Sequence, residues 1–248
     1  MPRSQDSPER RTSAISGQAL VSYLATMARI LIPSGGPSAW QQFLAKPDRQ
    51  WVTGYSARTI AHSWEAQPGW PPEVAAIIEQ VVGPTKLLLA IPEHKTPLPG
   101  GQRESQSDVF ALGRHAGGLI ACTIEGKVNE PFGPTVGEWM KDASAGKRVR
   151  LAYLCRSLGL AECPDDVHYQ LLHRTVSALI EAENFATRDA AMIVHSFSPE
   201  RRWLPAFEHF LALLGVSAEP GQPAVLTVPS GQRLILGWAC GDPVHLAA

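Results

Sequence analysis

Two carboxylates and one amine stand close together in the sequence: Asp108, and then Glu125 and Lys127 within the triplet EGK. Hard divalent cations such as Mg²⁺ take carboxylate oxygens and keep several waters, so one or two acids suffice for each ion. Such an ion polarises a phosphoryl oxygen and lowers the pKa of a bound water. A neighbouring lysine can orient or deprotonate that water, and the backbone oxygen of Gly126 can complete the coordination. These residue types point to metal-assisted hydrolysis of a phosphate ester.

The chain around these residues predicts how they come to share one surface. It has the pattern of a β-hairpin, with one strand over Asp108–Gly113 and a second over Leu119–Val128. If the loop is the two-residue pair Ala-Gly, Asp108 lies directly opposite Glu125, with the two Cβ atoms about 5 Å apart on one face. Lys127 is two residues from Glu125 and shares that face. The opposite, apolar face then carries Ile120, Cys122, Ile124 and Val128.

The elements that must hold this hairpin are predicted from apolar spacing. Period-3.6 patterns predict helices over Gly17–Ile32, Ser38–Ala45, Ser56–Glu65, Glu73–Val82, Val136–Lys141, Arg148–Leu158, Tyr169–Asn184 and Leu204–Leu214. Continuous apolar runs predict strands over Lys86–Ile91, Ala190–Phe197 and Arg233–Ala239, and the Pro/Gly-rich stretch Glu93–Gln106 predicts a loop. We expect residues 1–16 to be a disordered tail and residues 17–248 to form a single α/β domain with a helical N-terminal extension. A central mixed β-sheet with flanking helices is the expected packing.

An acid on one strand followed by Glu-x-Lys on the next resembles the active site of the PD-(D/E)XK nuclease superfamily. The predicted order of helix, three strands, helix and strand over roughly residues 60–200 matches the restriction-endonuclease-like αβββαβ core of that superfamily. The phrases EGKVNEPFGP, YQLLHR and MIVHSFS further resemble an uncharacterised bacterial family with this presumed fold. The chain departs from the superfamily pattern in carrying Ser107, not proline, before Asp108; the proline is not a ligand.

The resemblance implies a Mg²⁺- or Mn²⁺-dependent nuclease that acts on DNA before RNA. Asp108 and Glu125 would hold the ion and Lys127 would position the water. The resemblance also suggests Glu65 as an additional acid and Gln170, at the start of the helix Tyr169–Asn184, as a polar residue of the site. Phosphate contacts are expected from the basic side chains of the later helices, namely Arg148, Arg150 and Arg174.

The composition limits other functions. Of the 248 residues, 44% are hydrophobic and 18% charged, which is ordinary for a globular protein, and the net charge of −1 argues against a protein that coats nucleic acid. The four cysteines have no zinc-site spacing, so we expect reduced thiols. No apolar stretch is long enough to span a membrane, and no signal peptide is evident. We expect a cytoplasmic protein with no membrane partner, and a homodimer is an option.

Several alternatives stay open on the sequence. Glu125 and Lys127 can be a solvated strand face with an exposed salt bridge, and Asp108 can be the N-cap of a short helix. A second Glu-x-Lys, beginning at Glu93, follows Pro92, which is expected to end the preceding strand, so Glu93 is at most an accessory acid. The whole domain can instead be a catalytically inactive nuclease-like module that binds nucleic acid or a protein partner. A phosphohydrolase acting on a small molecule is a third option.

Overall fold

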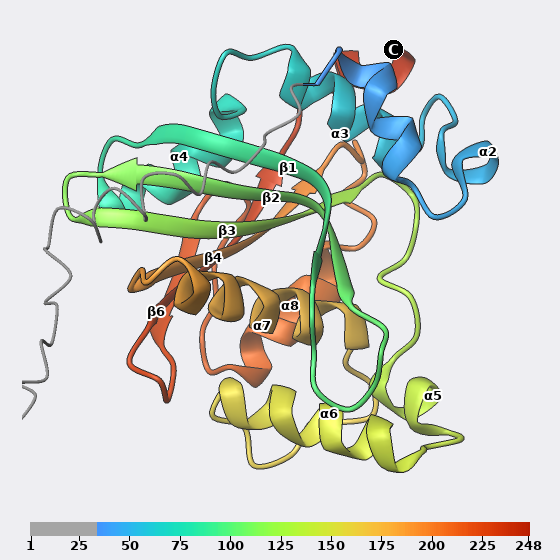
Figure 1. Cartoon of the computed structure of the whole chain (residues 1–248), viewed down its shortest axis with the longest axis vertical. Coiled ribbons are helices and arrows are strands. Elements are labelled where there is room, and N and C mark those ends of the chain that lie inside the picture. The colour runs from blue at the N-terminus through green and yellow to red at the C-terminus, as the bar shows by residue number, and fades with distance from the viewer. Residues whose placement is uncertain (1–33) are drawn as a thin grey trace, which may run out of the picture. The chain divides into compact units, whose positions relative to one another are not determined.

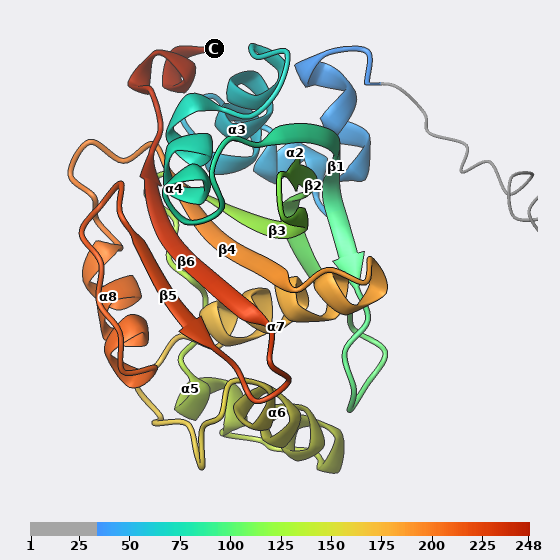
Figure 2. The ribbon, with the colours of Figure 1, turned by 90° about the vertical axis from the view of Figure 1, so that its left-hand side faces the viewer.

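A six-stranded mixed sheet organises residues 34–248, the part of the chain that this computed structural model describes (Figures 1 and 2). The strand order is β1-β2-β3-β4-β6-β5. The strands are β1 (Lys86–Thr96), β2 (Ser105–His115), β3 (Gly118–Lys127), β4 (Asp189–Ser196), β5 (Pro223–Thr227) and β6 (Arg233–Cys240). Pairs β1–β2, β2–β3 and β5–β6 are antiparallel, whereas β3–β4 and β4–β6 are parallel. The mixed α/β class is confirmed, while the predicted tail and the helix Gly17–Ile32 lie outside the described residues.

The predicted hairpin is confirmed, including its register. The pairing runs from His115 opposite Gly118 to Val109 opposite Ile124, which leaves a two-residue loop. The alternative that Asp108 caps a helix is excluded, because Asp108 lies within β2. The ladder of β2 and β3 therefore extends to Val109 and Ile124, the residues next to Asp108 and Glu125.

Helices cover both faces of the sheet (Figures 1 and 2). On one face α3 (Ser56–Glu65) and α4 (Pro72–Val82) pack over the predicted apolar residues of β3, namely Ile120, Cys122, Ile124 and the following Val128. On the other face α7 (Tyr169–Asn184) packs over residues of the opposite parity, such as Ala121. Because successive strand residues alternate between faces, Glu125 and Lys127 are placed on the α7 side.

The helix boundaries largely follow the sequence signals. α3 and α7 have the predicted bounds, and α5 (Val136–Met140) and α8 (Leu204–Leu213) end one residue early. α6 (Ala145–Ser157) begins three residues before its prediction because the Ser144 hydroxyl accepts the backbone N–H of Lys147 as an N-cap. None of the helices in residues 34–248 is long and apolar enough to cross a lipid bilayer.

The main error concerns Pro92, which does not end a strand. β1 continues through Pro92 to Thr96, and Thr96 pairs with Ser105. Proline is tolerated here because β1 is an edge strand, so the missing N–H need not bond to a neighbour. A 3₁₀ helix, η1 (Pro37–Phe43), stands where a short helix was expected, and the elements that were not predicted are α2 (Pro47–Gln50), β5 and η2 (Pro243–Ala247).

Candidate active site

Three carboxyl groups line up across three neighbouring strands. Glu93 of β1 and Asp108 of β2 lie between the partner pairs Pro92–Val109 and His94–Ser107, so they face each other. The β2–β3 register, continued by one residue beyond Val109–Ile124, places Asp108 opposite Glu125. All three line one cavity of about 400 Å³, together with Gln170 and Arg174 of α7. Glu93 has a positive φ of 51°, which a non-glycine residue seldom adopts. We call this space the acidic cavity.

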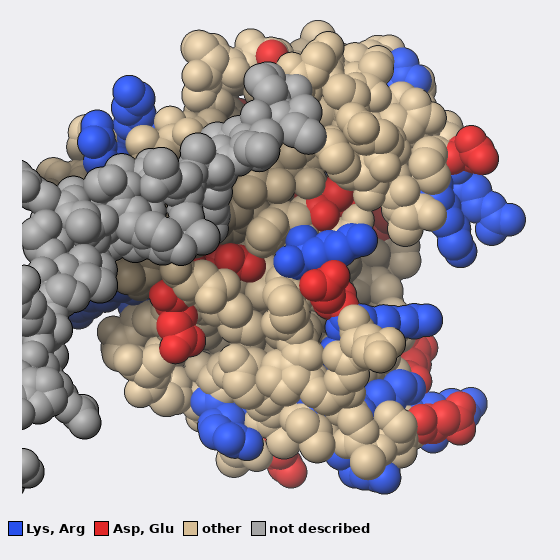
Figure 3. Space-filling model, in the orientation of Figure 1, with Lys and Arg blue, Asp and Glu red and all other residues tan. Residues whose placement is uncertain are grey.

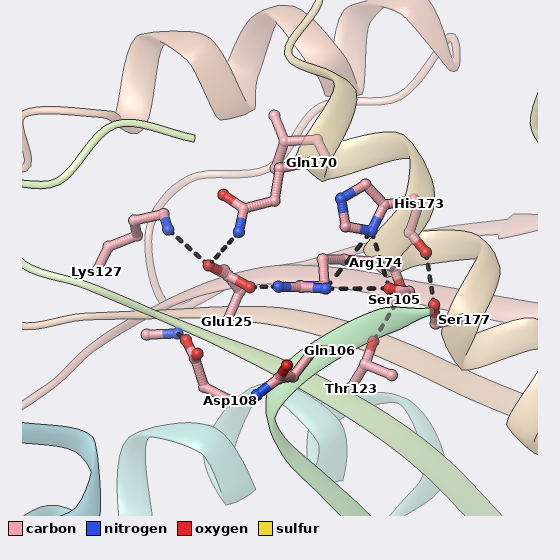
Figure 4. A network of polar contacts seen from close by, with 12 residues as sticks. Ser105, Gln106, Asp108, Thr123, Glu125, Lys127, Gln170, His173, Arg174 and Ser177 are labelled. Atoms are coloured by element: carbon pink, nitrogen blue, oxygen red, sulfur yellow. Dashed lines mark hydrogen bonds and ion pairs between the residues drawn. The ribbon is translucent and has the colours of Figure 1, made fainter. Parts of the chain in front are cut away.

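Glu125 is the buried centre of the network in Figure 4. Its Oε1 accepts from Lys127 Nζ at 2.6 Å and from Gln170 Nε2 at 2.7 Å, and its Oε2 accepts from Arg174 Nε at 2.6 Å. Burial alone would raise the pKa of Glu125, but the charges and hydrogen bonds of Lys127 and Arg174 hold it below its usual value. Glu125 is therefore ionised, and because both Glu125 and Lys127 are buried, their ion pair is not the exposed salt bridge of the alternative interpretation.

The other two acids lack such compensation. Burial, followed by the negative charges of Glu125 and Glu93, raises the pKa of Asp108 well above its usual value. Burial raises the pKa of Glu93 to about 7, against the opposing effect of the hydrogen bond that it accepts from Gln106 Nε2 at 2.7 Å. The acidic cavity thus holds more carboxyl groups than its cations balance at neutral pH.

Asp108 and Gly126 are held together at the point where the hairpin ladder ends. Asp108 Oδ2 accepts the backbone N–H of Gly126 at 2.6 Å. Phe197 N donates to Lys127 O at 2.8 Å, so the backbone groups of Lys127 face β4 and those of Gly126 face β2. The Gly126 carbonyl is thereby directed to the side of the strand on which Asp108 lies.

The Arg174 side chain is held by a second layer of polar contacts. Its Nη1 donates to Ser105 Oγ at 3.0 Å, and Ser105 Oγ lies 2.8 Å from His173 Nδ1. Burial, and then the positive charges of Arg174, Arg150 and Lys127, lower the pKa of His173 well below its usual value, so the ring is neutral. The Ser105 hydroxyl accepts from Arg174 and shares a hydrogen bond with His173, which fixes the guanidinium against Glu125.

The sequence reasoning missed Ser105, His173 and the partnership of Arg174 with Glu125. One local signal was available: Gln170 and Arg174 are four residues apart on α7 and so project from the same side of the helix. Glu93 was expected to be at most an accessory acid, because Pro92 was expected to end the preceding strand. The strand continues, and Glu93 lines the acidic cavity.

Other predicted residues lie elsewhere or act differently. Glu65 Oε1 accepts from Trp40 Nε1 at 2.7 Å, and Glu65 does not line the acidic cavity. Arg150 is buried, and its guanidinium donates to the carbonyls of Leu98, Pro99 and Gly101. The guanidiniums of Arg150 and Arg174 are both bonded to partners within the protein, and their expected phosphate contacts stay a prediction. Arg148 is exposed on α6 and donates to Ala143 O.

The donor chemistry of the acidic cavity fits a hard cation, but its oxygens do not form a coordination shell. Carboxylates from three strands and the Gly126 carbonyl are the oxygen ligands that Mg²⁺ prefers. Within residues 34–248, however, no group of three or more His, Cys, Asp or Glu residues is placed to hold a metal ion. Both oxygens of Glu125 already accept hydrogen bonds, Oε1 from Lys127 and Gln170 and Oε2 from Arg174, so an ion would share this carboxylate with those donors or displace one of them.

Fold and site together define a mixed α/β domain with an acidic cavity where the central antiparallel hairpin meets α7. Residues 33–243 match the model of the family DUF6946, which is described as a domain of unknown function, and the chain belongs to this family. No curated protein and no solved structure matches the chain.

The Glu125–Arg174 pair can be tested by a double-mutant cycle. We expect Arg174→Gln to lower the free energy of unfolding by about 3–5 kcal/mol, because it leaves the buried Glu125 charge short of one partner. The double variant Glu125→Gln/Arg174→Gln should cost much less than the sum of the two single changes. Urea unfolding measures each value, with Arg148→Gln as the exposed control, expected within about 0.5 kcal/mol of wild type. Additive costs would contradict the pairing.

The unbalanced acids predict a pH dependence of stability. A carboxyl group whose pKa is raised by folding stabilises the fold fully below its unfolded value of 4.5, and that contribution is lost as the pH rises toward about 7. We therefore expect the unfolding free energy of Glu93→Gln to depend less on pH over this window than that of the wild type. At pH 8 the variant should be more stable than the wild type by about 2 kcal/mol. Urea unfolding from pH 4.5 to 8 measures this effect. Glu219→Gln, at an exposed position, serves as control, and a Glu93→Gln profile parallel to wild type would refute the expectation.

Proposed function

We propose that the chain is a metal-dependent phosphodiester hydrolase of the PD-(D/E)XK type, acting on nucleic acid and on DNA before RNA. The observation that carries the proposal is the row of Glu93, Asp108 and Glu125 across three adjacent strands, with Lys127 bonded to Glu125. The order α4, β1–β3, α7, β4 supports it, since it is the helix, three-strand, helix, strand order of that superfamily.

Each residue has a role that its contacts support. Asp108, Glu125, Glu93 and the Gly126 carbonyl would hold Mg²⁺ or Mn²⁺, which when bound polarises a phosphoryl oxygen and acidifies a water. Lys127 positions or deprotonates the attacking water once its amine leaves Glu125. Gln170 orients Glu125 through its amide. The raised pKa values of Asp108 and Glu93 support a cationic ligand, because a divalent ion would replace the protons that otherwise neutralise them.

Substrate phosphates would have further contacts at the wall of the acidic cavity. On the face drawn in Figure 3, acidic and basic side chains are interspersed and form no continuous basic band, so the grip on a phosphate backbone must be local. Arg49 of α2 is exposed and lines the acidic cavity beside Tyr55, which is 47% exposed. A guanidinium and an aromatic ring at the cavity wall suit a phosphate and an unstacked base, respectively.

One observation favours a second candidate function, the catalytically inactive nuclease-like module. Both Glu125 oxygens are occupied, by Lys127, Gln170 and Arg174, and a carboxylate satisfied in this way can serve as a structural tie between β3 and α7. Such a module would bind nucleic acid or a protein partner without cleaving it.

Cleavage assays separate the two functions. We expect the wild-type chain to cut plasmid or single-stranded DNA with Mg²⁺ or Mn²⁺, and Lys127→Ala and Asp108→Ala each to lose about 100-fold or more, since each removes a group that acts at the reacting centre. Glu65→Gln is the control and should keep full activity, because Glu65 does not line the cavity.

If no cleavage is observed, a measurement of Mg²⁺ binding distinguishes the two functions. Mg²⁺ should raise the melting temperature of the wild type at pH 8 but not that of Asp108→Asn. No metal-dependent cleavage, or cleavage that survives both alanine substitutions, would reject the hydrolase. DNA binding without cleavage and without Mg²⁺ stabilisation would favour the inactive module.

The assignment of the phosphate contact is tested by salt dependence. We expect Arg49→Gln to weaken binding of single-stranded DNA and to reduce the slope of log affinity against log salt by about 1, because one phosphate contact is lost. Arg148→Gln is the matched control on α6, and its slope should equal that of wild type. Fluorescence anisotropy with a labelled oligonucleotide, in EDTA to prevent cleavage, gives both slopes. If only Arg148→Gln reduced the slope, the phosphate contact would be assigned to Arg148 on α6, and the assignment to Arg49 would be rejected.

A further inference from the structure

Two cysteines are brought together at the end of α6, away from the acidic cavity. Cys155 lies in the last turn of α6, and Cys163 follows in the connection to α7. Gly159, with φ 75°, ends the helix: Leu160 N donates to Cys155 O at 2.9 Å and Gly159 N donates to Arg156 O at 3.1 Å. This pair of hydrogen bonds is the Schellman motif, which reverses the chain so that the segment after Gly159 returns along the last helical turn.

Both cysteines line one cavity of about 520 Å³, which shares no lining residue with the acidic cavity. Arg148 and Arg156 also line it and give its wall a positive character, with Glu162 as the lining acid. Cys155 is buried and Cys163 is half-buried, so a reagent reaches the two sulfurs through this cavity. We call it the dithiol cavity.

The two thiols interact with each other. The hydrogen bond from the Cys163 thiol to the Cys155 sulfur lowers the pKa of Cys155 to about 7, despite the opposing effect of burial. The same hydrogen bond, then burial and the charges of Asp166 and Asp165, raise the pKa of Cys163. Of the two thiols, Cys155 is therefore the one that loses its proton more readily.

The remaining two cysteines do not line the dithiol cavity. Burial raises the pKa of Cys122, which lies in the core between β3 and α3–α4, and Cys240 is exposed. A nucleophilic thiolate next to a second thiol is the arrangement that a reversible dithiol–disulfide pair requires.

We propose that Cys155 and Cys163 form a modification site at which Cys155 attacks low-molecular-weight disulfides and Cys163 then closes an intramolecular disulfide. In the first step the Cys155 thiolate bonds to one sulfur of a disulfide RSSR, the S–S bond breaks, and RS⁻ leaves. In the second step Cys163 attacks the Cys155 sulfur of the mixed disulfide, a second RS⁻ leaves, and the Cys163 proton passes to a released thiolate. The protein dithiol is oxidised by two electrons, and RSSR is reduced to two thiols.

The proposal does not depend on the proposed function of the acidic cavity. Its structural consequence is a covalent tie between the end of α6 and the connection to α7. α6 also carries Arg150, whose guanidinium holds the carbonyls of the segment between β1 and β2. Reduction by thiols reverses the tie.

The test uses the full chain with Cys240→Ser, which removes the exposed thiol, and oxidised glutathione as the disulfide. We expect two of the three remaining thiols to be lost, with peptide mapping showing a Cys155–Cys163 link that dithiothreitol reverses. With Cys163→Ser added, glutathione should stay on Cys155 as a mixed disulfide. Free Cys155 and Cys163 after treatment, in protein that remains folded by circular dichroism, would overturn the proposal.

A kinetic measurement tests the interaction of the two thiols before any disulfide forms. The rate of Cys155 alkylation by iodoacetamide should rise with pH with a midpoint near 7. Replacing Cys163 by alanine should slow alkylation at pH 7 about five- to tenfold, because the thiolate loses the thiol that stabilises it. An unchanged midpoint and rate would show that the two sulfurs do not act together, and would reject the site.

Discussion

The burial of one ionised carboxylate, that of Glu125, governs the arrangement of the centre of this domain. Taking a carboxylate out of water costs several kcal/mol, and the cost is offset only if opposite charges and hydrogen bonds surround it. Lys127 from the same strand and Arg174 from α7 provide the charges, and Gln170 provides an additional donor. α7 must therefore meet β3 in one rotation and one register, which also places Ser105 and His173 behind Arg174.

The end of the hairpin is shaped by a close approach on its other face. A Cβ at Gly126 would lie 3.2 Å from both Asp108 Oδ2 and Ile60 Cδ1, so the carboxylate and the Ile60 side chain would each have to shift by a few tenths of an ångström. Glycine thus allows α3 to pack closely, while its own N–H holds the Asp108 carboxylate. A glycine at position 126 therefore suits both the Asp108 carboxylate on β2 and the packing of Ile60 on α3.

The three carboxyl groups of the acidic cavity are not equally compensated by positive charge. Glu125 is neutralised by its cations, whereas Glu93 and Asp108 depend on protonation or on an added cation. In the dithiol cavity, the hydrogen bond from Cys163 lowers the pKa of the Cys155 thiol against the effect of burial. In both places a buried ionisable group lacks full compensation from the fold, and such groups are where ligands and reagents act.

The sequence by itself determined the local geometry: the hairpin with its two-residue loop, the apolar face of β3, and the bounds of α3 and α7. These features follow from short-range periodicity and turn length, which are written in neighbouring residues. Only the tertiary structure decided that Glu93 lines the acidic cavity with Asp108 and Glu125, because β1 is an edge strand and can continue through Pro92. It also decided that Arg150 and Arg174 bind inward and that Glu65 bonds to Trp40, since the partner of a long polar side chain depends on which distant segment burial brings beside it.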